Sequence, residues 1–537
     1  MSDTSHEPHT PSPEAEPSSD PTPQDTTAAG QINAALSNPR ADMEELDALE
    51  HTLFALNYAL GEIGSLGPVI DPAKATEERG EAMATLAQAR VEALCKPEVG
   101  AFLERLSECP ELMGEVKQAQ VKILRRDRDS LVNVPAEEQA AFSRLTVEAN
   151  DVWRRAKPAN DWTSFEPYLD RIVEAMRSMA AAKDPAKDPY DVWLNEFEWG
   201  TDRAFYDRFF SQVKDCVVPL LADCVASRHK PTHTVVDGTF DEERQWRLAS
   251  DLMDLEGLDR DALWVGRTEH PFTGGPSQGF VLIASHVYPD NLLSNVFSML
   301  HEGGHALYEQ NSMPELRFTS LRGGTSMGMH ESQSRFFENI VGRSEAFAGP
   351  LLSVMKPHFQ GQLSRVTPHQ LYLAENCVEP GLIRTEADEL TYPLHIMVRY
   401  EIEQLLFSGE ATASDVPRLW SEKYQQYLGV SVPDYEHGPL QDTHWSDGSF
   451  GYFPTYALGS AFGAQFKAAM LAEGMDFDGI CASGDLAPIR TWLCDRIWKW
   501  GRMKDSGELI EAACGEPFSP VYYTDYLTEK FSTLYRV

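Results

Sequence analysis

Hydrophobic residues recur at three- and four-residue steps through most of the chain after about residue 40. In the segment 43–66 this spacing is kept by Leu46, Leu49, Leu53, Leu56 and Leu60. Such spacing places apolar side chains on one face of an α-helix. The same pattern, interrupted by Pro and Gly, fills residues 77–95, 136–156, 165–182 and 205–228. The pattern predicts a mainly α-helical protein.

Signals for extended structure are few. The best is the run Gly279 to Tyr288, which is rich in β-branched and aromatic residues and ends before Pro289. The segment 290–310 that follows returns to helical spacing, with Asp290 and Asn291 available as N-caps. We therefore expect a small extended segment beside a helix over these residues.

The domain organisation follows from a change of composition near residue 35. Residues 1–35 are acidic and rich in Pro, Ser and Thr, which predicts a disordered tail. Residues 36–537 show no internal repeat and no Gly/Ser-rich linker. We expect them to form a single large helical domain around a groove.

Charge excludes two classes of partner. The chain has 83 Asp and Glu against 46 Lys and Arg, a formal net charge of -37. Nucleic acid and anionic membranes require a basic face, so neither is an expected partner. No apolar run is long enough to span a bilayer and no secretory signal is present, which favours a cytoplasmic protein. The eight cysteines form no CxxC pair, so we expect them to be reduced.

The predicted helix over 290–310 contains the sequence HEGGH, in which His301 and His305 are four residues apart. At this spacing both imidazoles lie on one helix face and can reach one metal ion. Glu302 points at a different angle, from which its carboxylate can reach a water molecule beside the metal. The alternative is a pair of solvent-facing histidines. Two glycines within the motif each disfavour a helix by about 0.5–1 kcal/mol, which indicates close packing against another segment.

A catalytic zinc site has three protein ligands, so a third must come from elsewhere in the chain. The segment 328–344 is a second predicted helix, and it offers Glu331. Glu309 and Glu315 are competing carboxylates. Glu309 follows His305 by one turn and cannot easily fold back to the same ion. The spacing therefore favours Glu331 and leaves the other two as alternatives.

Five segments together resemble the carboxypeptidase Taq family of metallopeptidases. They are HPF (270–272), HEGGHALYEQ (301–310), HESQSRFFEN (330–339), IRTEADELTY (383–392) and GPLQDTHWSDGSFGYFPTYALG (438–459). The resemblance extends from about residue 40 to the C-terminus. Several motifs matched in the order of the family are far more specific than one HExxH motif.

The resemblance implies a mainly helical metallocarboxypeptidase domain with a deep substrate groove. It implies a homodimer that releases single C-terminal amino acids from peptides with broad specificity. The ligands of one divalent metal would be His301, His305 and Glu331, with Glu302 as the general base. Zn²⁺ is the expected ion, with Co²⁺ and Mn²⁺ as alternatives.

Other matched residues are expected at the substrate. His444 is the candidate donor to the developing oxyanion, followed by the tyrosines of GYFPTYALG, of which Tyr456 is one. Gln441 and His270 belong to matched motifs and are expected to bind substrate. Arg384 is the candidate that holds the substrate's terminal carboxylate. The alternatives are structural roles: a buried histidine, core aromatics, a groove-shaping loop, or a pair between Arg384 and Asp388.

The chain departs from the family at one motif. Before the metal-binding helix the family has DxRxT, whereas this chain has FVLIAS, with Phe280, Leu282 and Ala284 at the three positions. The absent arginine leaves Arg384, or the unmatched Arg322, to hold a terminal carboxylate. It also leaves open a metallo-oligopeptidase that cuts peptides internally. A non-enzymatic, zinc-stabilised scaffold is a further alternative, which the intact general base disfavours.

Overall fold

A computed structural model describes residues 39–70, 72–268 and 270–537. The predicted tail, residues 1–35, lies outside the described residues. Helices make up most of the described chain, and its one sheet has three short strands. The prediction of a mainly α-helical protein with a small extended segment is therefore confirmed.

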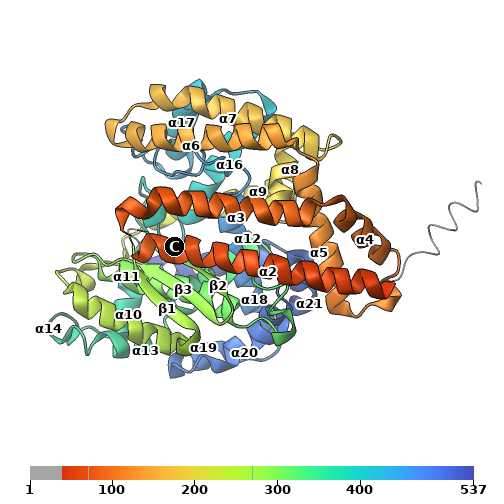
Figure 1. The fold of residues 1–537 in the computed structure, drawn as a ribbon. Helices are drawn as coiled ribbons and strands as arrows, with labels where there is room; N and C mark the ends of the chain where they lie inside the picture. Colours follow the sequence, from red (N-terminus) through yellow and green to blue (C-terminus); the bar gives the residue numbers. More distant parts are fainter. Residues whose placement is uncertain (1–38, 71, 269) are drawn as a thin grey trace, which may run out of the picture.

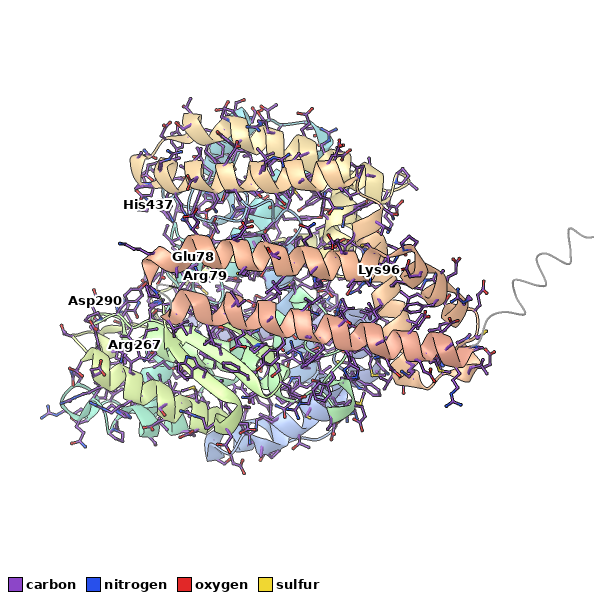
Figure 2. All side chains as sticks on the ribbon, viewed as in Figure 1. Glu78, Arg79, Lys96, Arg267, Asp290 and His437 are labelled. Atoms are coloured by element: carbon purple, nitrogen blue, oxygen red, sulfur yellow. The ribbon has the colours of Figure 1, made fainter. Side chains whose placement is uncertain are left out.

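Two long N-terminal helices cross the molecule side by side, α2 (Pro39–Ile70) and α3 (Thr76–Cys95) (Figure 1). Helix α3 runs from near Glu78 and Arg79 at one end to Lys96, just beyond the other (Figure 2). Two shorter helices, α4 (Pro97–Ser107) and α5 (Glu115–Val132), follow Lys96 and pack against α2 and α3. The four helices share a small core that includes Leu46, Leu49, Leu53, Leu94, Phe102 and Leu103.

A second group of helices lies above α3 in Figure 1. It consists of α6 (Ala136–Ala159), α7 (Trp162–Lys183), α16 (Tyr392–Ser408) and α17 (Val416–Tyr427), with α8 (Pro189–Phe197) and α9 (Arg203–Ala226) beside them. The helices predicted from residues 77 to 228 are all present, with ends that differ by a few residues. The periodic apolar faces of α7 and α9 are buried in the core, whereas α3 buries only Leu94 fully.

The remaining helices belong to one large core, and α11 is the one among them that packs closely on the sheet. They are α10 (Glu242–Glu256), α11 (Leu292–Gln310), α12 (Met327–Arg335), α13 (Ala348–Met355), α14 (Gln360–Leu363), α15 (Pro368–Glu375), α18 (Pro454–Ala472), α19 (Phe477–Ser483), α20 (Ala487–Arg496), α21 (Ser506–Cys514) and α22 (Val521–Tyr535). A π-helical turn, Phe336–Val341, continues α12. Short 3₁₀ turns occupy Ala73–Ala75, Pro110–Leu112, Thr234–Val236, Arg260–Ala262, Pro314–Leu316, Arg384–Glu386, Ala413–Asp415 and Trp498–Trp500.

The sheet contains β1 (Leu263–Arg267), β2 (Phe272–Ser277) and β3 (Phe280–Ser285) in the order β1-β3-β2. The central strand β3 pairs parallel with β1 and antiparallel with β2. Only β3 was predicted, because its unbroken apolar run is typical of a strand buried on both faces. Strand β2 contains Gly and Pro, which are uncommon in strands, so its sequence does not predict a strand. The same residues lie where the register is irregular, between Gly274 and Ser277.

Helix α11 packs against β2 and β3 on one side and against α10 and α12 on others. The side chain of Asn291 accepts a hydrogen bond from the Ser294 amide, which confirms it as the N-cap. Since this helix is fixed on several sides, the residues of its HEGGH segment have well-defined positions. Within the described ranges, no helix has the length and apolar character needed to cross a membrane.

Candidate metal centre

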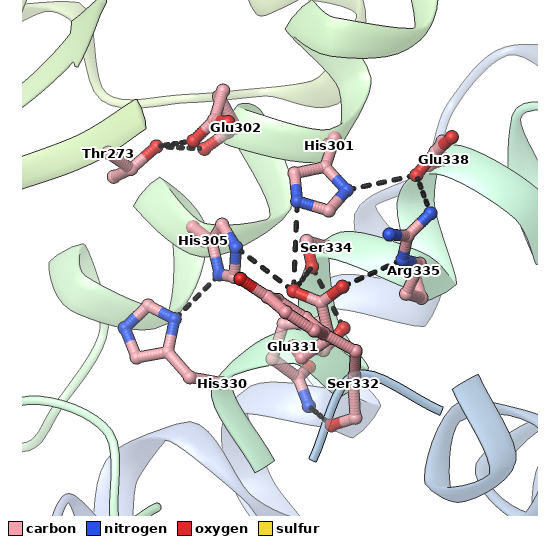
Figure 3. Close-up of polar contacts among 12 residues, drawn as sticks. Thr273, His301, Glu302, His305, His330, Glu331, Ser332, Ser334, Arg335 and Glu338 are labelled. Atoms are coloured by element: carbon pink, nitrogen blue, oxygen red, sulfur yellow. Dashed lines mark hydrogen bonds and ion pairs between the residues drawn. The ribbon is translucent and has the colours of Figure 1, made fainter. Parts of the chain in front are cut away.

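The ligand atoms of His301, His305 and Glu331 converge at the contact between α11 and α12. One ligand atom from each residue lies within 4.8 Å of the other two. The Oε2 atom of Glu331 is 3.7 Å from His301 Nε2 and 3.5 Å from His305 Nε2 (Figure 3). Because the two histidines are one turn apart, their rings present Nε2 to the same carboxylate.

This geometry fits one divalent ion. Ligand atoms at about 2.0–2.2 Å from a tetrahedral ion are separated from one another by roughly 3.3–3.5 Å. The two nitrogen-to-oxygen distances are close to that value. Two imidazoles and a carboxylate are also a known donor set for catalytic zinc, in which a fourth position stays open.

Close packing brings the two helices together at Gly304. A Cβ atom at this position would lie 2.4 Å from the backbone oxygen of Gln333 and 2.7 Å from the Cα atom of Ser334. Gly303 is similarly restricted, since a Cβ atom there would lie 2.0 Å from Oε2 of Glu256. The two glycines of HEGGH thus allow the approach of α12 and α10 that the sequence indicated.

We expect Gly304→Ala to destabilise the protein and to weaken metal binding. Although Ala favours a helix by about 1 kcal/mol over Gly, the new methyl group would push α12, and with it Glu331, away from α11. Overpacking of this kind lowers the free energy of unfolding by about 1–3 kcal/mol. Thermal unfolding and chelator competition would measure the two effects.

Gly349→Ala is the matched control for this substitution. Gly349 lies in the helix α13, and a Cβ atom there would meet no atom within 4 Å. We expect this variant to gain up to about 1 kcal/mol of stability. Equal behaviour of the two alanine variants would mean that close packing at Gly304 does not position the metal ligands.

His301 is oriented by a carboxylate. Its Nδ1 atom lies 2.9 Å from Oε2 of Glu338, which leaves Nε2 for the metal. Arg335 donates to Oε1 of Glu331 at 2.7 Å and to Oε2 of Glu338 at 3.0 Å (Figure 3). Burial opposes ionisation of Glu331, but the charge of Arg335 and the two imidazoles outweigh it and lower the pKa of Glu331. The carboxylate is therefore held in the ionised form that binds a metal.

His305 is oriented by a second histidine. Its Nδ1 atom lies 2.6 Å from Nδ1 of His330, whose Nε2 atom lies 2.9 Å from Oε1 of Glu309. Arg322 donates to the other Glu309 oxygen at 3.2 Å. If His305 offers its Nε2 lone pair to a metal, its Nδ1–H must donate to His330, which then donates from Nε2 to Glu309. The competing carboxylate Glu309 thus contacts the site through His330.

Glu302 lies beside this cluster with its carboxylate held by β2. The hydroxyl of Thr273 donates to Oε2 of Glu302 at 2.6 Å (Figure 3). Burial raises the pKa of Glu302 above the ordinary glutamate value. A buried carboxyl group with a raised pKa is suited to accept a proton and release it again.

These groups line a cleft of about 560 Å³, here called the active-site cleft. The three ligand residues and Glu302 all contribute to it, as do Thr273, Glu309, Arg322, His330, Tyr452 and Tyr456. Of the residues predicted to bind substrate, Tyr456 lies in this lining. His270, Gln441, Arg384 and His444 do not.

Arg384 is buried behind Tyr456, with 9% of its surface exposed. Its guanidinium donates to both oxygens of Asp442, at 3.1 and 2.9 Å, and lies 5.1 Å from the centre of the Tyr456 ring. The sequence-based alternative of a pair with Asp388 is wrong, because Asp388 caps the turn before α16. Gln441 accepts from the Arg384 amide and thereby fixes this segment.

His444 connects Tyr456 to the same buried region. Its Nε2 atom is 3.3 Å from the Tyr456 hydroxyl. Burial and the charge of Arg399 lower the pKa of His444 to about 3, so the ring is neutral. His270 is exposed at the start of β2, while the next residues, Pro271 and Phe272, line the cleft.

Several residues around the ligands were missed in the sequence. Glu338 could have been found, since Glu331, Arg335 and Glu338 recur at helical spacing among buried phenylalanines. Thr273 carries no such signal, because the sheet brings it to the site. Glu309 and Arg322 were considered for other roles, and their pairing with each other was not predicted. Leu282, at the position of the family arginine, is fully buried in β3.

Comparison with known proteins gives consistent matches over most of the chain. A family model described as carboxypeptidase Taq (M32) metallopeptidase matches residues 68–531. Carboxypeptidase 1 of Bacillus subtilis is 34% identical over 464 residues, which cover 86% of this chain and 93% of that protein. Thermostable carboxypeptidase 1 of Thermus thermophilus is 35% identical over 476 residues, with the same two coverages. The crystal structure of an M32 carboxypeptidase from Deinococcus radiodurans superposes with a TM-score of 0.89 at 32% identity, covering 93% of this chain and 100% of the other.

Proposed function

The chain belongs to the carboxypeptidase Taq family of metallopeptidases, and on that premise we propose that it removes single C-terminal amino acids from peptides with broad specificity. The observation that carries this proposal is the convergence of His301, His305 and Glu331 in one cleft with Glu302 beside them. A metal-dependent peptide hydrolase needs these two parts, a three-ligand site and a neighbouring base.

A divalent ion held by these three residues would polarise the scissile carbonyl and make water a better nucleophile. Glu302 takes the proton of the attacking water and passes it to the leaving amine. Thr273 holds the Glu302 carboxylate at the wall of the cleft. The Tyr456 hydroxyl, in contact with neutral His444, is placed to donate to the developing oxyanion.

We propose that Arg384 attracts the terminal carboxylate of the substrate from behind Tyr456. Arg384 and Arg399 both donate to Asp442, so two guanidinium charges share this carboxylate. Glu403, the other carboxyl group close to Arg399, accepts hydrogen bonds from Tyr190, Trp445 and the Gly451 amide and has no contact with Arg384. The guanidinium of Arg384 beside the cleft residue Tyr456 supports an anion-binding role, which Leu282 cannot supply.

Arg384→Met is expected to remove the preference for a free C-terminal carboxylate. The measurement compares kcat/KM for one peptide and its C-terminal amide, in wild type and variant. Wild type should prefer the free acid because a charge-assisted hydrogen bond contributes about 1.5–3 kcal/mol, or roughly a tenfold to hundredfold ratio. The variant should cleave acid and amide at similar rates.

Arg365→Met is the control, because Arg365 is exposed on the surface and lines no part of the cleft. This variant should keep the wild-type ratio of kcat/KM for the free acid to kcat/KM for the amide. If wild type cut acid and amide equally and internal fragments appeared first, the enzyme would be an oligopeptidase. A ratio that persists in Arg384→Met would assign the carboxylate to another residue, of which Arg322 is the first to test.

We further propose that zinc is the native metal, with Co²⁺ and Mn²⁺ as alternatives, and that the enzyme is a cytoplasmic homodimer. The two-histidine, one-glutamate donor set supports zinc. All eight cysteines are unpaired, which agrees with a reducing compartment. Metal analysis of the purified protein would test the identity of the metal, and the mass of the protein in solution would test the homodimer.

A further inference from the structure

The structure contains a second, larger cavity of about 860 Å³, lined by residues of α3, α5 and α8. We name it the basic hollow, because Lys and Arg outnumber Asp and Glu in its lining. This composition is opposite to that of the whole chain, whose net charge is -37. A local excess of positive charge in an acidic protein therefore needs its own explanation.

Part of this charge has no close carboxylate. Arg502 pairs with Asp127 at 3.0 Å and Lys183 with Glu196 at 3.0 Å, so these four groups neutralise one another. Elsewhere in the lining, Arg90 and Arg125 form no ion pair with any described residue.

Arg126 is the cation of this group whose guanidinium packs against an aromatic ring. Its guanidinium lies 5.0 Å from the centre of the Trp199 ring, and the carboxylate oxygen paired with it, Oδ1 of Asp127, is 3.7 Å away. Burial and the nearby charge of Arg502 lower the pKa of Arg126. Of these three guanidinium groups in one cavity, Arg126 has one long ion pair and the other two have none with a described residue. Guanidinium groups with free donors bind carboxylates well, because their planar donor pairs match the two oxygens.

The basic hollow and the active-site cleft each share lining residues with a third, smaller hollow. This smaller hollow of about 150 Å³ shares Arg90, Asp127 and Arg502 with the basic hollow. It shares Arg322 with the active-site cleft. Along β2, Thr273 lines the cleft and Pro276 lines the smaller hollow. Three residues of a strand span about 10 Å, so a peptide can reach from one to the other within a few residues.

We propose that the basic hollow binds acidic side chains of the peptide substrate, upstream of the residue that is removed. This inference rests on the proposed function, in which the terminal carboxylate lies toward Arg384, behind Tyr456. The smaller hollow adjoins the active-site cleft at Arg322, so we place the upstream part of the substrate on that side. An Asp or Glu side chain that is as far from the scissile bond as the basic hollow then contacts Arg90, Arg125 and Arg126. The enzyme accordingly accepts many C-terminal residues but prefers peptides with an acidic residue at that upstream distance.

The test is a set of otherwise neutral peptides in which one Asp is moved from about the third to the tenth residue upstream of the scissile bond, each paired with an Asn peptide. In wild type, kcat/KM should be about tenfold higher for Asp than for Asn at one or two neighbouring positions. The ratio should fall as salt is added, since salt screens the charges. Arg126→Gln should bring the ratio close to one. Arg418→Gln, an exposed arginine on α17, should retain the preference.

Arg125→Gln provides a second variant in case loss of the contact with Trp199 unfolds Arg126→Gln. Binding of the same peptides as labelled C-terminal amides, followed by fluorescence anisotropy, separates this proposal from the proposed function. Tighter binding of the Asp amide, together with no release of a C-terminal residue from the free-acid peptides, would support the basic hollow and contradict the carboxypeptidase activity. An Asp-to-Asn ratio near one at every position, in both binding and turnover, would overturn the proposal, as would a preference unchanged in both arginine variants.

Discussion

Replacing Glu302 by Gln should lower kcat/KM for peptide hydrolysis by about 10² to 10⁴ while the protein remains folded and binds its metal. The amide has nearly the same shape as the carboxylate and can still contact Thr273, but it cannot take up a proton from water. Because Glu302 is not among the three converging ligands, metal content should stay at the wild-type value. Steady-state kinetics and metal analysis of one preparation measure both.

Glu315→Gln is the matched control for this substitution. Glu315 is exposed in the short turn Pro314–Leu316 and does not line the active-site cleft. Its amide variant should have wild-type activity. A Glu302→Gln enzyme with near wild-type turnover would remove Glu302 from the mechanism and require another base in the cleft.

Replacing His305 by Ala should have the second large effect, loss of both metal and activity. The substitution removes one of three ligand atoms, and it also leaves His330 without its partner at Nδ1. Loss of a residue that only orients a ligand weakens metal binding by about 10- to 100-fold, so loss of the ligand itself should exceed about 100-fold. Chelator competition gives the affinity directly.

Glu338→Gln provides the graded comparison, because Glu338 contacts the ligand His301 but not the metal position. We expect its affinity to lie between those of wild type and His305→Ala. If Glu338→Gln lost as much affinity as His305→Ala, the carboxylate would be a ligand. If His305→Ala retained a full equivalent of tightly bound metal, the two-histidine site would be wrong.

The helices could be predicted from the sequence because the spacing of their apolar residues indicates which face is buried. The apolar stripe of α2 and the N-cap Asn291 of α11 are local signals, and both are observed. The i,i+4 pair His301 and His305 is local in the same sense, which is why the ligand positions on α11 follow from the helix alone. Strands β1 and β2 have no such signal, since they are stabilised by pairing with β3.

The surroundings of the site depend on contacts between distant segments. Thr273 reaches Glu302 only because β2 packs on α11, and Arg322 reaches Glu309 from a loop. The third ligand was ambiguous in the sequence for the same reason. An arginine contacts each of the two carboxylates, Glu331 and Glu309. The difference between them is that Oε2 of Glu331 faces Nε2 of both ligand histidines, whereas Glu309 contacts His330.

The position of the metal is the central claim, and anomalous diffraction from crystals of the zinc-loaded enzyme tests it most directly. The expected result is one strong peak per chain, at about 2.0–2.2 Å from Nε2 of His301, Nε2 of His305 and a carboxylate oxygen of Glu331. A peak bound instead by His330 and Glu309, or no peak at the HEGGH helix, would contradict the account.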